Sequence, residues 1–342
     1  MSKAFLPTIF LFGMPMGLIG AGLNAHHLME LFALNHDISI AIILYGWLSL
    51  AVVTLLYLPA LIGFKDKSHR LLLVDEWHDP FKRSFLPAVS LTFMLLLMSL
   101  ATVFEQNHTY QAWLFYAAIF IAIMHLGLNL FLINGWLFNQ AVNIEHHKPT
   151  WFILLSANFI IVIAFSTVFK SESVLLQELI WLYYAAALFL WIAFTTTLFY
   201  RLLFMKPLHV NLRPSLFIFL APPSLGTIAA LFISQSFQST SLLSIDAVGL
   251  VAWFGFSFAT IILILWLLKY RYFIESGLSL GAWSYVYPLA AYGLAAQYMA
   301  QALNSQLLII YSMVIFIVLL AFIVLLSVWL IKQLGYFWSV NS

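Results

Sequence analysis

The chain has 342 residues, of which 64% are hydrophobic and 8% are charged, and its formal net charge is +2. Soluble globular proteins carry about 25% charged residues, so this composition excludes a water-soluble fold. The small net charge gives no basis for a nucleic-acid partner, and the absence of cysteine excludes disulfides, thiolate metal sites and cysteine nucleophiles.

Apolar stretches long enough to cross a bilayer follow one another along almost the whole chain. A membrane helix needs about 20 apolar residues, and the first such run lacks the small-residue cleavage pattern of a signal peptide. The predicted membrane helices are 5–27, 38–64, 84–105, 111–139, 149–169, 174–204, 214–235, 246–272, 279–302 and 306–333. No linker rich in Pro, Gly or Ser divides the chain. We therefore predict an all-α integral membrane protein of ten helices, with a single membrane domain over residues 1–342.

The charged residues predict the orientation of these helices. With ten helices, thirteen of the 14 Lys and Arg residues fall on one side of the membrane and only Lys170 falls on the other. Cytoplasmic loops carry the excess of Lys and Arg, so both termini are predicted to be cytoplasmic. The longest polar break, 65–83, is then a cytoplasmic interfacial segment.

Proline is distributed unevenly among the predicted helices. Odd-numbered helices contain or begin with most of the prolines, namely Pro7, Pro15, Pro87, Pro149, Pro214, Pro222, Pro223 and Pro288, and only Pro59 lies within an even-numbered helix. Proline frees a backbone carbonyl, which membranes tolerate where neighbours or a water-filled cavity satisfy it. The pattern favours five helical hairpins with the odd-numbered helices facing a shared interior. Simple kinks in packed helices explain it equally well.

The helix interiors carry no Lys, Arg, Asp or Glu, which disfavours a tightly binding, carboxylate-coupled pump. Hydroxyls and loosened backbone N–H groups beside a basic cytoplasmic rim suit the passage of an anion instead. The candidate pore-lining residues on odd-numbered helices are Ser90, Asn158, Pro222, Ser224, Thr227 and Ser284. The polar ones fit helix–helix hydrogen bonding as well. Gly13 and Gly17 flank Pro15, and they either leave room near a pore axis or form a packing face of small residues.

The ten histidines do not suggest a cofactor site. His125 is the one that lies deep in a predicted helix, so a haem would have no obvious second axial ligand. There is no glycine-rich phosphate loop for ATP. We therefore predict no cofactor, no metal and no enzymatic activity. Two alternatives to simple anion passage stay open: a proton-coupled dicarboxylate carrier that uses His125, and a membrane redox enzyme subunit.

Five segments resemble one known family of membrane proteins. They are FGMPMGL at 12–18, EWHDPFKRSFLP at 76–87, KPTWFILLSANF at 148–159, RPSLFIFLAPPSLG at 213–226 and ESGLSLGAWSYVYPLAA at 275–291. Together they are similar to the TehA-type tellurite-resistance/dicarboxylate transporter family, which includes the plant slow anion channels. The resemblance implies five hairpins around a central pore, a homotrimer, and a bacterial inner-membrane location. It also implies small anions as substrates, such as monovalent anions, sulfite or C4-dicarboxylates.

The same resemblance implies a gate in the ninth helix. The family commonly has a W-x-F-x-F pattern whose last aromatic residue closes the pore. Here the corresponding stretch is Trp283-Ser284-Tyr285-Val286-Tyr287, so Tyr287 takes the gate position, directly before Pro288.

Overall fold

The computed structural model describes residues 8–62, 74, 76–104, 108–138, 143–169, 173–236 and 245–341. All regular structure in these ranges is helical, which confirms the predicted all-α membrane fold. Nine of the described segments are long and apolar enough to cross a membrane. They are Ile9–Leu31, Asp37–Leu58, Leu86–Val103, Tyr110–Phe138, Pro149–Thr167, Val174–Phe204, Val210–Ser234, Val248–Leu268 and Gln306–Gln333. Pro7 and most of the predicted interfacial segment 65–83 lie outside the described residues.

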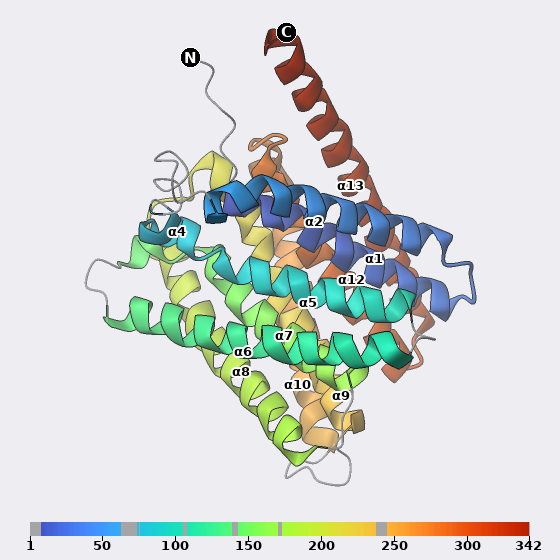
Figure 1. Cartoon of the computed structure of the whole chain (residues 1–342). Helices are drawn as coiled ribbons and strands as arrows, with labels where there is room; N and C mark the ends of the chain where they lie inside the picture. The colour runs from blue at the N-terminus through green and yellow to red at the C-terminus, as the bar shows by residue number, and fades with distance from the viewer. Residues whose placement is uncertain are drawn as a thin grey trace.

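Consecutive long helices pack side by side as hairpins (Figure 1). The pairs are α1 (Gly13–Leu31) with α2 (Asp37–Ile62), α5 (Leu86–Val103) with α6 (His108–Phe138), α7 (Phe152–Thr167) with α8 (Val174–Phe204), α9 (Ala221–Ser236) with α10 (Ile245–Leu268), and α12 (Val286–Ala302) with α13 (Gln306–Asn341). The connections between successive hairpins contain α4 (Pro80–Arg83), η2 (Ile144–His146) and α11 (Tyr270–Ile274).

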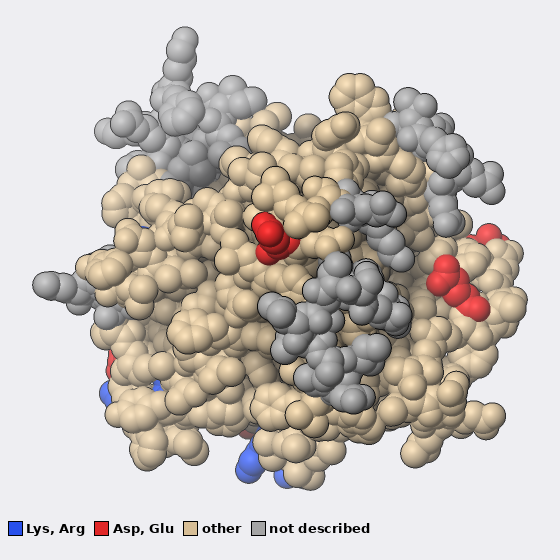
Figure 2. All heavy atoms as spheres, turned by 90° about the horizontal axis from the view of Figure 1, so that it is seen from below, with Lys and Arg blue, Asp and Glu red and all other residues tan. Residues whose placement is uncertain are grey.

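The first helices of the five hairpins form a closed inner ring. Helix α1 contacts α5, α5 contacts α7, α7 contacts α9, α9 contacts α12, and α12 contacts α1 again. Ring and outer helices differ sharply in burial, since Pro149–Thr167 is 94% buried and Tyr110–Phe138 is 28% buried. On the face shown in Figure 2, uncharged side chains predominate, Asp and Glu residues are visible near the centre and at the right, and Lys and Arg residues lie near the lower and left margin. The outer helices expose large apolar side chains such as Trp113, Phe189 and Leu250, which suits contact with lipid.

Four ring helices begin with a 3₁₀ segment in place of the continuous helix that the hydropathy predicts. These segments are η1 (Ile9–Phe12), η3 (Pro149–Trp151), η4 (Val210–Leu220) and η5 (Leu280–Tyr285). Proline cannot donate to the carbonyl four residues earlier, and a 3₁₀ turn supplies a different donor. In η4, for example, Ile218 O lies four residues before Pro222 and accepts instead from Ala221 N–H.

The ninth predicted helix, 279–302, corresponds to η5 and α12. Its polar groups bond to α1 inside the ring: Asn24 Nδ2 donates to Ala290 O at 2.9 Å, and Gln297 Nε2 donates to Asn24 Oδ1 at 3.4 Å. Because these groups are buried, their hydrogen bonds specify how α12 docks on α1.

A buried carboxylate fastens the start of the ring to the outer layer. Ile9 N–H donates to Glu76 Oε1 at 2.8 Å, and the Tyr57 hydroxyl donates to the other carboxylate oxygen of Glu76. Glu76 is 4% exposed. It therefore ties η1, α2 and the segment before α5 together.

Candidate functional site

A cavity of about 510 Å³ lies inside the ring, and all five ring helices line it. The ring helices are the first members of successive hairpins and run in the same direction, so their C-terminal ends meet at one end of the molecule. The lining residues near these C-terminal ends are largely polar and include His26, His27, Glu30, Thr102 and Thr167. We call this cavity the vestibule. Deeper in the vestibule the lining becomes apolar.

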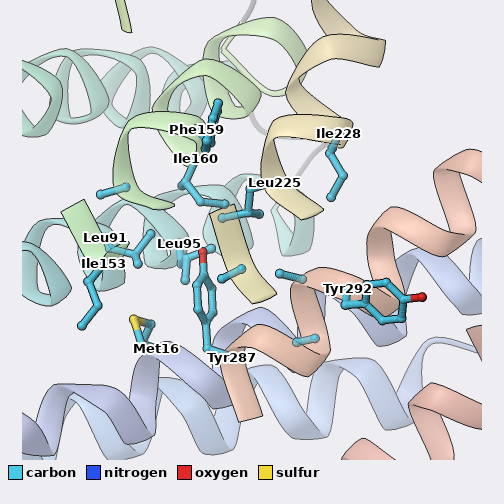
Figure 3. Packing of buried hydrophobic residues seen from close by; sticks show 14 of the residues in the cluster. Met16, Leu91, Leu95, Ile153, Phe159, Ile160, Leu225, Ile228, Tyr287 and Tyr292 are labelled. Atoms are coloured by element: carbon cyan, nitrogen blue, oxygen red, sulfur yellow. The ribbon is translucent and has the colours of Figure 1, made fainter. Parts of the chain in front are cut away.

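Tyr287 of α12 lines the vestibule. Its side chain projects from α12 among Met16, Leu95 and Leu225 (Figure 3). The residue is 3% exposed, and its hydroxyl has no hydrogen-bond partner among the described residues.

Glycines on α1 allow α12 to approach closely enough to place this ring. A Cβ added at Gly20 would lie 3.0 Å from Cδ2 of Tyr287, and one added at Gly17 would lie 2.9 Å from Cβ of Val286. Any larger residue would push α12 away, because real Cβ contacts are rarely this short. Our sequence analysis noted Gly17 and missed Gly20, although their spacing of three places both on one helix face.

The predicted polar pore residues form hydrogen bonds outside the vestibule lining. Ser90 Oγ lies 2.8 Å from Nδ1 of His125 on α6, and Asn129 Nδ2 of α6 donates to Asn158 Oδ1 at 2.8 Å. Thr227 donates to Ala252 O of α10 at 3.1 Å. These three residues therefore join ring helices to outer helices. Their direct participation in an ion path stays a prediction.

The remaining candidates lie at the Tyr287 end of the ring or within the 3₁₀ segments. Ser224 donates to Leu220 O at 2.8 Å, and Ser284 donates to Gly281 O at 2.6 Å. The buried residues Gly13, Pro15, Pro222 and Pro288 belong to the first turns of α1, α9 and α12. A Cβ added at Gly13 would meet no atom within 4 Å, in contrast to one at Gly17.

The mouth of the vestibule carries a charged cluster that the sequence analysis did not single out. Glu30 is the one Asp, Glu, Lys or Arg among the described lining residues, and it lies 3.4 Å from His26 Nε2 and 3.3 Å from His27 Nδ1. His27 also stacks on Tyr298 with ring centroids 4.2 Å apart. In the described part of the chain, no three His, Cys, Asp or Glu side chains are grouped to hold a metal ion.

Comparison with known proteins agrees with this architecture. The chain is 25% identical over 340 residues to a tellurite resistance protein TehA homolog of Haemophilus influenzae, covering 97% of this chain and 93% of that protein. It is 20% identical over 298 residues to an uncharacterized transporter of Methanocaldococcus jannaschii, covering 85% of this chain and 82% of that protein. The family model described as voltage-dependent anion channel matches residues 7–331. We conclude that the chain belongs to the voltage-dependent anion channel family and is an anion channel of that family, not an enzyme.

Proposed function

We propose that anions cross the membrane along the axis of the five-helix ring and that Tyr287 is the gate. The observation that carries the proposal is the position of Tyr287 at the floor of a cavity to which every ring helix contributes. The path runs from the vestibule past the Tyr287 ring, between Met16 and Leu95, toward the N-terminal ends of the ring helices. This assignment places the main energy barrier at one apolar neck.

The packing around Tyr287 supports a gate that opens by movement of the ring. The buried hydroxyl forms no hydrogen bond with a described residue, so the ring is held by apolar contacts alone. A buried hydroxyl without a partner costs about 1–3 kcal/mol. Phenylalanine fits the same site without this cost, and alanine leaves the neck unfilled.

The gate can be tested with purified protein in proteoliposomes by measuring chloride and nitrate flux. Tyr287→Ala should raise the flux several-fold, and Tyr287→Phe should leave it low. Tyr292→Ala is the matched control, because Tyr292 lies on the same helix but points away from the neck (Figure 3). Equal, low flux in the wild type and in Tyr287→Ala, with both proteins folded, would place the seal elsewhere.

The substrates are small anions, and we propose monovalent anions, sulfite or C4-dicarboxylates. The lining of the vestibule offers only weak binding sites for an anion. This suits conduction, because an ion held strongly would not leave. A flux panel over these anions, with and without a pH gradient, separates a channel from a proton-coupled carrier. A reversal potential that followed the cation gradient would contradict the proposal. We further propose a homotrimer in the bacterial inner membrane with both termini cytoplasmic.

A further inference from the structure

A buried cation lies near the end of α8, outside the vestibule. Arg201 belongs to the last turn of this outer helix and is 7% exposed. Its Nε and Nη1 groups have no hydrogen-bond partner among the described residues. Removing a charge from water costs several kcal/mol unless an opposite charge and hydrogen bonds compensate. The position of Arg201 therefore points to an anion that completes the site.

Two basic residues near Arg201, His147 and Lys148, make the binding of an anion there more favourable. His147 and Lys148 lie just before η3, and the positive charge of Arg201 acts unfavourably on the protonated forms of both. His147 Nε2 is 3.0 Å from Phe194 O of α8, which fixes this loop against the helix. The exposed carboxylate of Glu145 acts favourably on Arg201, and Asp79 acts favourably on Lys148.

A third basic residue, Arg213, packs on the aromatic ring of Tyr272. The guanidinium of Arg213, in η4, lies 4.0 Å from the centroid of the Tyr272 ring. Arg213 Nη1 donates to Tyr272 O at 3.1 Å and to Glu275 Oε2 at 2.5 Å. Its Nε group is buried and has no hydrogen-bond partner among the described residues. Arg213 belongs to the segment that follows α8, so Arg201, Lys148 and Arg213 lie at the same end of the ring helices.

The location of the cluster indicates the source of the anion. Next to Arg201, α8 exposes Tyr200, Leu203 and Phe204 by 54%, 71% and 70%, so this part of the helix faces lipid. The charged residues around it belong to the depth of the lipid headgroups. Basic pockets between membrane helices bind anionic headgroups, and the planar guanidinium fork matches a phosphate.

We propose that Arg201, together with Lys148 and Arg213, binds a phosphate group, and that an anionic phospholipid supplies it. Arg201 donates to the phosphate oxygens, and Lys148 and Arg213 add positive charge at the rim. The site is independent of Tyr287 and of the ion path. Its occupation stabilises the contact of α8 with η3 and η4.

The proposal can be tested by thermal unfolding of the delipidated full-length protein in neutral detergent. Phosphatidylglycerol, phosphatidylcholine and inorganic phosphate are titrated separately. Phosphatidylglycerol should raise the unfolding midpoint saturably, and phosphatidylcholine should not. In Arg201→Gln the apparent affinity for phosphatidylglycerol should fall about tenfold or more, since one hydrogen bond to a charged group is equivalent to at least such a factor.

Arg271→Gln is the matched control, because Arg271 is an exposed arginine whose Nε donates to Tyr270. It should keep the wild-type response. An Arg201-dependent response to inorganic phosphate but not to lipid would support the phosphate site and assign it to the free ion. If Arg201→Gln fails to fold, Lys148→Gln replaces it and should also weaken the response. Equal responses in the wild type and the folded variant would overturn the proposal.

Discussion

At the scale of single residues, the first feature is the hydrogen bonding of polar side chains that are buried among the membrane helices. Most buried polar side chains are bonded across helices: Thr260 and Tyr311, for example, each lie within hydrogen-bond distance of the Tyr292 hydroxyl. The buried hydroxyls of Tyr287 and Tyr184 have no hydrogen-bond partner among the described residues. A buried hydroxyl normally finds a partner, so under the proposed gate the Tyr287 ring is held in place by packing alone.

Burial shifts the pKa of His147, which lies in the loop just before η3. Burial lowers the pKa of His147 to about 4, the Arg201 charge adds to the shift, and the contact with Phe194 O opposes it. An unfolded histidine has a pKa of about 6.5, so below this pH the unfolded state binds more protons. The contribution of neutral, buried His147 to the free energy of unfolding is therefore fully present above about pH 6.5, and it is lost as the pH falls toward 4.

We expect the midpoint of thermal unfolding to decrease between pH 7 and pH 5 in the wild type and to change much less in His147→Gln. Glutamine keeps a donor for Phe194 O but cannot be protonated. His209→Gln is the control, because His209 is exposed, and it should retain the wild-type pH dependence. A pH dependence that is the same in all three proteins would show that His147 does not titrate with folding.

At the scale of elements, the hairpins depend on close helix contacts at glycine. A Cβ at Gly22 of α1 would lie 2.5 Å from Cγ1 and 3.0 Å from N of Ile43 of α2. A Cβ at Gly46 of α2 would lie 2.7 Å from Cγ1 of Ile19. Small residues allow membrane helices to pack by van der Waals contact, which is their main attraction in lipid.

Gly22→Ala should therefore destabilise the protein by about 1–3 kcal/mol, the usual cost of overpacking. Gly127→Ala on the outer helix α6 is the matched control, because a Cβ there would meet no atom within 4 Å. It should be neutral or stabilising by up to about 1 kcal/mol through helix propensity. The fraction of protein that survives heating in detergent, measured by size exclusion, reports both changes. Equal stability of the two variants would mean that α1 and α2 can separate at no cost.

At the scale of the whole molecule, the alternation of ring and outer helices gives the chain two kinds of membrane segment. Ring helices pack against protein on most sides, and outer helices expose large apolar residues to lipid. Among the described residues that line the cavity inside the ring, Glu30 is the one Asp, Glu, Lys or Arg. The predicted loops at one end of the molecule carry almost all Lys and Arg. Such an asymmetry raises the concentration of anions at one mouth.

This asymmetry predicts the topology. Reporters fused after Phe64 or Phe204 should behave as cytoplasmic, and reporters fused after Asn107 or Ser239 should behave as external. Phe204 ends α8, whereas the other three positions lie outside the described residues. Activity of periplasmic and cytoplasmic reporters in cells measures the result. If the termini mapped to opposite sides of the membrane, the even number of spans would be wrong.

The sequence by itself determined the membrane class, the family resemblance and the gate candidate, because hydropathy and short motifs are properties of neighbouring residues. The motif around Trp283 was enough to select Tyr287. The proline pattern fitted a shared interior of odd-numbered helices and simple kinks equally well, and it did not predict the 3₁₀ entrances. These depend on which donor replaces the one that proline lacks.

Only the tertiary structure decided which side chains face the cavity. Ser90, Asn158 and Thr227 lie on ring helices, yet they bond to outer helices, since a helix face is assigned by its packing partners and not by its polarity. The mouth cluster around Glu30 and the buried charge of Arg201 also depend on tertiary packing. The burial and the neighbours of these side chains are set by packing between segments that are far apart in the sequence. Local sequence patterns do not contain this information.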